Sequence, residues 1–309
     1  MPRILELTDE QVIQSFPMKP SKPAASCLVN FLGVRTRKSF CKLLESYGDF
    51  EGYPIPANWH GTQLEWSGTL RSVLEAQYRF VAVELGAGWA PWLVSSAHAA
   101  QQRGIQEIKL IGVEGCARHH AFMVEHFRDN GLDPHQHELL FGVVGLSDGV
   151  ARFPAVEDAT ATYGEKAELT PRRLSLIQRL RQWKARLLGR RTPETQLRWE
   201  EVKSFSLATV LGTHRRIDLM HIDIQGHEYE LITASPDLFD TRVYRMVIGT
   251  HAHEIHQNID QFLRARGWIL EGEEPCEFET NRRGQSGLSK DGCQVWRNPA
   301  LALQAREAA

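Results

Sequence analysis

Apolar segments of strand length alternate with amphipathic segments of helical length through the middle of the chain. Runs of β-branched and other apolar residues predict buried strands, and apolar spacings of three and four residues predict helices. The expected strands cover residues 80–85, 108–114, 139–146, 217–224 and 243–250, and the expected helices include residues 62–77, 89–103 and 117–130. This alternation predicts an α/β fold with a doubly wound, mostly parallel sheet.

The two ends of the chain differ from this core. Prolines punctuate residues 1–61, which we expect to form an N-terminal cap packed on a main domain of residues 62–299. The C-terminal part is expected to hold, in order, a strand after Gly267, a polar loop at 271–291, a strand at 293–298 and a frayed tail at 300–309.

The stretch FVAVELGAGWAPW, residues 80–92, joins a strand, a glycine turn and the start of a helix. Backbone can come close to a bound cofactor at such a turn, beside the N-terminus of the helix. The acid before the glycines suits a cationic or hydroxylated part of a cofactor better than a pyrophosphate. The alternative is a glycine-rich turn without a ligand. Cofactor contacts are therefore expected from Glu84, Gly86, Ala87, Gly88 and Trp89.

Two further strand ends offer groups for a nucleoside. Glu114 ends the second strand, where a carboxylate can accept hydrogen bonds from both ribose hydroxyls, although it could also be a charge that merely ends a strand. Ser147 and Asp148 follow the third strand and are candidates to meet the adenine amine. Asp148-Gly149 is also an ordinary turn pair.

Residues of a reacting centre are expected after the fourth and fifth strands, because ligands of open parallel sheets bind at the carboxyl ends of strands. We assign Asp223, His227, Glu228 and His251 to this centre. A histidine with an unperturbed pKa near 6.5 can take a proton from a hydroxyl nucleophile at neutral pH. His251 is the first choice for this base and His227 the second, although each could be a hydrogen-bonded neighbour only.

A metal ion at this centre is an alternative that the sequence leaves open. Asp223, Glu228 and His251 could together hold a divalent cation, but their spacing matches no recognised zinc signature. The prediction is a site without a required metal.

Composition narrows the classes of protein. The formal net charge of -2 gives no indication of a nucleic-acid partner, and five scattered cysteines without CxxC spacing are typical of reduced cytosolic thiols. No apolar run is long enough to span a membrane, and the acidic N-terminus does not resemble a signal peptide, so a cytoplasmic protein is expected.

A basic amphipathic helix is expected at residues 172–191, inside an insertion of about 155–200 between the third and fourth strands. Its eight basic residues could lie on an anionic membrane surface or substrate. It could equally be a lid whose apolar stripe packs on its own domain.

Several of these motifs together resemble FkbM-type methyltransferases that use S-adenosylmethionine (SAM). The resemblance covers roughly residues 65–299 and is carried by ELGAGWAPW, IGVEG, IDLMHIDIQGHEYELI, GTHAHEIH and DGCQVWRNP. It implies a Rossmann-like sheet of seven strands, SAM as cofactor, and methylation of a hydroxyl on a sugar, glycan or glycosylated metabolite. Ala90 replaces a usual third glycine, and His227 stands where a small residue is common.

Two other classes of function compete with this interpretation. A nicotinamide dehydrogenase would favour GxGxxG spacing, but Trp89-Ala90-Pro91 follows Gly88 here and the third glycine is absent. A non-catalytic docking protein on the same fold would bind an anionic partner or membrane through residues 172–191.

Overall fold

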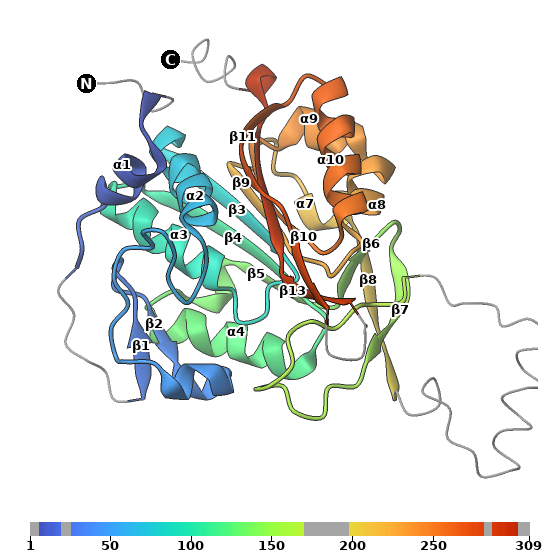
Figure 1. Ribbon diagram of the computed structural model, residues 1–309, viewed down its shortest axis with the longest axis horizontal. Coiled ribbons are helices and arrows are strands. Elements are labelled where there is room, and N and C mark those ends of the chain that lie inside the picture. Colours follow the sequence, from blue (N-terminus) through green and yellow to red (C-terminus); the bar gives the residue numbers. More distant parts are fainter. Residues whose placement is uncertain (1–5, 20–25, 170–197, 281–285, 302–309) are drawn as a thin grey trace, which may run out of the picture.

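The main sheet has seven strands and confirms the predicted doubly wound α/β architecture (Figure 1). The computed structural model describes residues 6–19, 26–169, 198–280 and 286–301. In spatial order the strands are β11 (Ile269–Glu274), β14 (Gly292–Arg297), β10 (Arg245–Thr250), β9 (Leu219–Ile222), β3 (Arg79–Leu85), β4 (Glu107–Glu114) and β5 (Glu138–Phe141). Strand β14 runs antiparallel to both of its neighbours, and the remaining pairings are parallel. The strand order reverses between β3 and β9, which is where a ligand crevice is expected.

Each face of this sheet has its own hydrophobic core. Phe80 and Ala82 of β3 belong to the core beneath α2 (Gln63–Glu75), α3 (Pro91–Gln102) and α4 (Ala117–Asp129). Val81 and Val83 belong to the opposite core, because successive side chains of a strand point to opposite faces. The helices on that second face are α7 (Leu207–Leu211), α8 (Glu228–Ala234), α9 (Pro236–Arg242) and α10 (His253–Ala265).

The expected third strand at 139–146 is in fact two strands that belong to different sheets. Strand β5 ends at Phe141, and the chain then turns at Gly142, whose φ is +152°. A Cβ at Gly142 would lie only 2.4 Å from the carbonyl oxygen of Lys203. The following residues form a separate sheet of β6 (Val143–Gly145), β8 (Trp199–Ser206) and β7 (Gly149–Pro154), in that spatial order.

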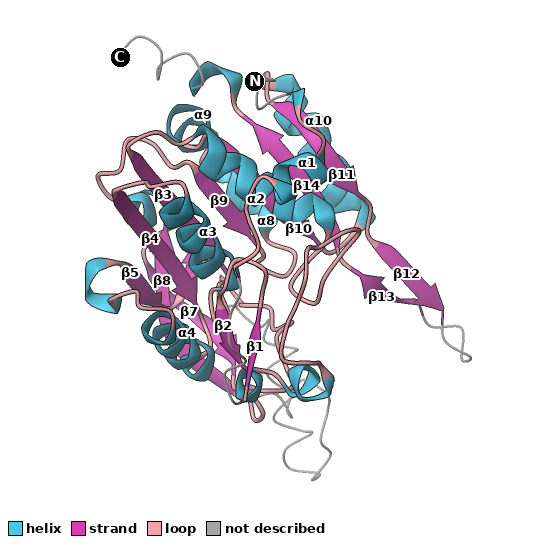
Figure 2. Cartoon of the chain, turned by 90° about the vertical axis from the view of Figure 1, so that its left-hand side faces the viewer, coloured by secondary structure: helices cyan, strands magenta, loops and turns pink. Residues whose placement is uncertain are grey.

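The N-terminal segment packs against the helices of the first face. It contains α1 (Asp9–Gln14), β1 (Cys27–Val29), β2 (Arg35–Arg37), η2 (Lys38–Phe40) and η3 (Lys42–Ser46). Arg37 forms ion pairs with Glu125 and Asp129 of α4, and Phe31 packs edge-on against Trp66 of α2. Figure 2 shows β1 and β2 beside α4, so this segment lies against the helices on that face of the sheet.

Two predictions about the remaining segments have different outcomes. The stretch 271–291 was expected to be a polar loop, but its described residues include the hairpin of β12 (Glu277–Thr280) and β13 (Ser286–Lys290), which extends away from the main sheet (Figure 2). The described side chains of β12 are exposed, including the apolar Phe278. The expected basic helix at 172–191 lies outside the described residues. A short helix, η4 (Pro134–Gln136), precedes β5.

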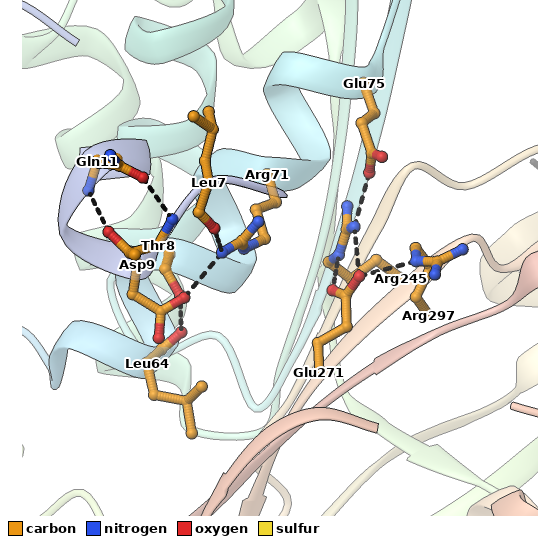
Figure 3. A network of polar contacts seen from close by, with 11 residues as sticks. Leu7, Thr8, Asp9, Gln11, Leu64, Arg71, Glu75, Arg245, Glu271 and Arg297 are labelled. Atoms are coloured by element: carbon orange, nitrogen blue, oxygen red, sulfur yellow. Dashed lines mark hydrogen bonds and ion pairs between the residues drawn. The ribbon is translucent and has the colours of Figure 1, made fainter. Parts of the chain in front are cut away.

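A buried network of ion pairs ties the sheet to α2 (Figure 3). The fully buried Arg245 guanidinium lies 2.7 Å from Glu271 and 2.6 Å from Glu75. Arg297 also donates a hydrogen bond to Glu271. Burial alone would raise the pKa of Glu271, but the two guanidinium groups hold it below its ordinary value. Arg245 begins β10, so this network joins α2 to the sheet at the end opposite the carboxyl ends of the parallel strands.

Candidate functional site

A cavity of about 540 Å³ lies at the carboxyl ends of β3, β4 and β9. Its floor is the loop between β3 and α3, and its walls come from segments far apart in the sequence. These wall segments are residues 59–62, 142–144, 163–169, 221–227 and 290–293. The cavity therefore occupies the place that the reversal of strand order predicts for a ligand.

In the loop between β3 and α3, the position of Gly86 is packed too tightly for a larger residue. Gly86 has a φ of +77°, and a Cβ there would lie 1.8 Å from the carbonyl oxygen of Asp223. The backbone N–H groups of Gly86 and Ala87 both donate to the Val113 carbonyl at 3.0 Å. Ala90 also adopts a left-handed conformation, with φ of +58°, and the helix begins only at Pro91. The missing third glycine thus leaves alanine in a conformation that costs an L-residue about 1–2 kcal/mol.

Glu84 lines the cavity at the end of β3 and is only 2% exposed. Its carboxylate accepts a hydrogen bond from the Leu93 amide at 3.0 Å, near the N-terminus of α3. Burial raises the pKa of Glu84 well above its ordinary value. A cationic group of a ligand beside this carboxyl would favour its ionised form.

Glu114 also lines the cavity, and both of its carboxylate oxygens have backbone partners. One oxygen accepts from Gly88 N–H at 2.7 Å and the other from Cys116 N–H at 2.6 Å. These bonds join the end of β4 to the glycine loop of β3. The carboxylate keeps lone pairs for further donors, because each oxygen has about two acceptor sites.

Ser147 and Asp148 lie outside the lining of this cavity. Asp148 instead accepts hydrogen bonds from the Ser206 amide at 2.8 Å and the Thr209 hydroxyl at 2.8 Å, at the N-terminus of α7. The reason is the turn at Gly142, because the loop after the third core strand begins there rather than at residue 147. The cavity is lined at this point by Gly142, Val143 and Val144.

Asp223, Glu228 and His251 come together as the strand-end rule predicts. His251 lies between two carboxylates, with Nδ1 3.0 Å from Glu228 Oε1 and Nε2 3.2 Å from Asp223 Oδ1. Burial lowers the pKa of His251, but the two carboxylates outweigh it and raise this pKa to about 10. The expectation of a histidine that titrates near neutral pH is therefore wrong for the protein alone, in which His251 is a cation. Asp223 lines the cavity, and His251 lies behind it.

His227 lines the cavity as well, but both of its nitrogens already have partners. Nε2 lies 2.9 Å from the Ala167 carbonyl, and Nδ1 lies 3.1 Å from Glu230 Oε2. The His227 ring therefore ties the wall segment 163–169 to the start of α8.

The structure adds residues that the sequence did not single out. His221, in the middle of β9, lines the cavity, stacks on Trp92 at 5.0 Å and is neutral because burial lowers its pKa to about 4. Its only sequence signal is a histidine inside an apolar strand. Trp59 stacks on Trp89 at 5.8 Å, and Tyr163 meets Trp89 edge-on at 4.8 Å. No sequence signal brings these three aromatic residues together.

Carboxyl groups dominate the charge of the cavity. Among the described lining residues, the one Lys or Arg is Lys290. The carboxyl groups of the lining belong to Glu65, Glu84, Glu114, Glu165, Asp223 and Asp291. Burial raises the pKa of Glu65 to about 7, so not all of these groups are charged at neutral pH. The lining suits a cationic or hydroxylated ligand and disfavours a phosphorylated one.

Comparison with known proteins gives one family. The family described as "Methyltransferase FkbM domain" matches residues 155–270. A protein of Jannaschia sp. (strain CCS1) that carries the name of a methyltransferase is 33% identical over 297 residues, which are 94% of this chain and 98% of that protein.

Solved structures align with lower identity. Methyltransferase FkbM from Methylobacillus flagellatus KT aligns with a TM-score of 0.42 and 8% identity, over 75% of this chain and 54% of that one. An O-methyltransferase from Bacillus cereus in complex with SAH aligns with a TM-score of 0.37 and 8% identity, over 76% of this chain and 80% of that one. The fold assignment rests on the strand order of the sheet. Within the part of the chain that the structure describes, no helix has the length and apolar character to cross a membrane.

Proposed function

The chain belongs to the FkbM family of methyltransferases, and from this premise we propose that it transfers the methyl group of SAM to a hydroxyl of an uncharged, carbohydrate-containing acceptor. The products are the methyl ether, S-adenosylhomocysteine (SAH) and a proton. The observation that carries the proposal is the arrangement of Glu114 and Asp223 at opposite sides of the glycine loop, facing one cavity.

The cofactor would lie over the glycine loop. SAM carries a cationic sulfonium and an ammonium group, and the buried Glu84 carboxyl lies beside the loop to receive positive charge. Glu114 is held by two backbone amides and can accept from the ribose hydroxyls. The adenine would lie against Gly142, Val143 and Val144 rather than beside Ser147 or Asp148, because the former residues line the cavity.

The acceptor hydroxyl would be held next to Asp223. Methyl transfer is an in-line displacement, so its rate depends strongly on the position of the attacking oxygen. Attack by a neutral hydroxyl produces a protonated ether, which is a far stronger acid than a carboxylic acid. The Asp223 carboxylate can therefore take this proton, even though its pKa is held below the ordinary value by His251. His251 is expected to orient Asp223 and to keep it ionised before the reaction.

The aromatic wall supports a carbohydrate acceptor. Trp59 and Tyr163 line the cavity with Trp89, and flat aromatic faces pack well against the C–H faces of sugars. A phosphorylated sugar fits less well, because Lys290 is the one cationic lysine or arginine among the described lining residues. We therefore expect a neutral glycoside or glycosylated metabolite.

Calorimetric titration of the full-length protein with SAM, SAH and NAD tests the cofactor. We expect micromolar binding of SAM and SAH and no binding of NAD. Incubation with SAM and a panel of neutral glycosides should then yield one product heavier by a methylene group, detected by mass spectrometry. Binding of NAD without binding of SAH would contradict the proposal, as would a panel in which only amines or thiols are methylated.

A further inference from the structure

The cluster of Asp223, Glu228 and His251 contains buried polar atoms that make no hydrogen bond with the described residues. Each of these residues offers a ligand atom for a metal, and the three atoms lie within 4.8 Å of one another. The residues come from three separate segments, namely the end of β9, the start of α8 and the end of β10. Asp291, which precedes β14, also approaches the cluster, with Oδ1 3.8 Å from His251 Nε2.

Several buried polar atoms of this cluster have no hydrogen-bond partner among the described residues. They are Nδ1 and Nε2 of His251 and Oε2 of Glu228. The His251 side chain is 9% exposed and the Glu228 side chain is 0% exposed. Each nitrogen of His251 has a carboxylate as ion-pair partner, Glu228 at 3.0 Å and Asp223 at 3.2 Å, but no further hydrogen bond within the described part of the chain. Buried polar groups are normally hydrogen-bonded, so this cluster has free capacity for a ligand or an ion.

The two sides of the His251 ring face different environments. Nδ1 is nearest to Glu228, which is held in place because its Oε1 accepts from Gly226 N–H at 2.9 Å. Nε2 is nearest to Asp223 and Asp291, which both line the cavity. A histidine that ligates a metal through one nitrogen commonly donates from the other to a carboxylate. The arrangement of Glu228 behind His251 has this form.

We propose that a first-row divalent cation binds at Asp223, at Nε2 of His251 and at Asp291, with Glu228 as the positioning carboxylate behind the imidazole. One nitrogen and two carboxylate ligands suit a cation such as Mn²⁺. The cation would take the place of the Nε2 proton and would offset part of the charge of three neighbouring carboxylates. The remaining coordination positions face the cavity.

The role of this cation rests on the proposed function, although its binding does not. A cation at the cavity wall would hold the acceptor oxygen in line with the methyl group and lower the pKa of its hydroxyl. Two adjacent hydroxyls of a sugar ring could occupy two positions of the cation. The site would thereby favour acceptors that carry a vicinal diol.

Titration of Mn²⁺ into EDTA-treated full-length protein, followed by the electron paramagnetic resonance signal of free Mn²⁺, tests the site. We expect one saturable Mn²⁺ per chain. Asp223→Asn should weaken Mn²⁺ binding at least about 10-fold, and Glu228→Gln should weaken it about 10-fold through the orientation of His251. Glu254→Gln removes a charge from an exposed residue in the first turn of α10 and should leave Mn²⁺ binding unchanged.

Asp291→Asn keeps the test decisive if the buried variants do not fold, because the Asp291 side chain is 57% exposed. It should also weaken Mn²⁺ binding about 10-fold. Absence of saturable Mn²⁺ binding in the wild type, or equal binding in wild type, Asp223→Asn and Asp291→Asn, would overturn the metal site.

Calorimetric titration with SAH in EDTA separates the two proposals. SAH binding without Mn²⁺ binding would leave the proposed function standing and remove the metal. Mn²⁺ binding without SAH binding would leave the metal site and remove the proposed cofactor.

Discussion

The cavity has one end at Glu114 and another at Asp223. The two ends differ in how many of their buried polar atoms have hydrogen-bond partners within the protein. At one end, backbone amides from the β3 loop and from residue 116 hold both oxygens of Glu114. At the other end, His221 and His251 are buried with no hydrogen-bond partner for either ring nitrogen among the described residues. A carboxylate that is already fixed can receive a hydroxyl without reorganisation, whereas buried ring nitrogens that lack hydrogen bonds, including those of His251 with its ion pairs, can gain them from a ligand. The first end suits cofactor recognition and the second suits chemistry.

The largest expected effect comes from the place where the two ends meet. A Cβ at Gly86 would press on the backbone of Asp223, so Gly86→Ala must displace either the glycine loop or the end of β9. We expect at least about a 100-fold loss of SAH affinity, or about 2.7 kcal/mol, by calorimetry. Gly104→Ala is the matched control, because its φ of +75° is similar and nothing lies within 4 Å of the added Cβ. Equal effects of both variants on SAH affinity would show that the loop tolerates the contact.

Removal of the Glu114 carboxylate, which accepts hydrogen bonds from two backbone amides, should have the next largest effect. Glu114→Ala should weaken SAH binding by about 1–3 kcal/mol, because the ribose hydroxyls and two backbone amides lose their acceptor. Glu107→Ala is the control, since Glu107 is an exposed carboxylate at the other end of the same strand. Unchanged SAH affinity in Glu114→Ala, measured by calorimetry, would remove the ribose assignment and the contrast between the two ends.

The stability of the protein should depend on pH through His126, which contacts the glycine loop at Trp89. His126 is fully buried, with Nδ1 2.8 Å from the Trp89 carbonyl and Nε2 3.3 Å from the Thr36 hydroxyl. Burial lowers the pKa of His126 to about 3. Because the folded pKa lies below the unfolded value of about 6.5, the unfolded state binds the proton first and stability falls as pH falls below about 6.5. This histidine alone should cost about 2 kcal/mol of unfolding free energy between pH 7.5 and pH 5.

Urea unfolding at pH 7.5 and pH 5 measures this cost. His126→Gln should be less stable than the wild type at pH 7.5, but should lose about 2 kcal/mol less on acidification, because it has no proton to bind. His135→Gln changes an exposed histidine and should keep the wild-type dependence. A wild-type dependence in His126→Gln would mean that other groups cause the acid sensitivity.

The sequence predicts the part of the site that depends on strand ends. The glycine loop, Glu114 and the cluster around His251 all follow apolar runs, and the rule that parallel strands end at one edge brings them together. The ionisation of His251 could not be predicted, because it depends on Glu228, whose place behind the ring is set by the packing of α8. Trp59 and Tyr163 could not be predicted either, since long-range packing alone brings these loop residues to Trp89.

The position of Ser147 and Asp148 outside the cavity lining has a local cause, and it leads to the smallest expected effect. An apolar run from 139 to 146 indicates one strand, but the chain turns at Gly142, where an added Cβ would lie 2.4 Å from the Lys203 carbonyl oxygen, and the core strand ends at Phe141. Asp148→Ala should therefore lower stability slightly, through the lost hydrogen bonds to Ser206 and Thr209 at the start of α7. SAH affinity should stay within about 2-fold, or about 0.4 kcal/mol.

Asp133→Ala is the matched control for this last variant, because the Asp133 side chain likewise accepts a backbone hydrogen bond at the start of a short helix, here from His135 at 3.0 Å in η4. Both variants should lose a similar amount of stability in urea unfolding and bind SAH alike. A selective loss of SAH affinity of about 10-fold in Asp148→Ala would mean that the adenine reaches residue 148. The cofactor site would then extend beyond the cavity wall formed by Gly142, Val143 and Val144. Its polar groups would then not all be held by the protein's own hydrogen bonds, as those of Glu114 are.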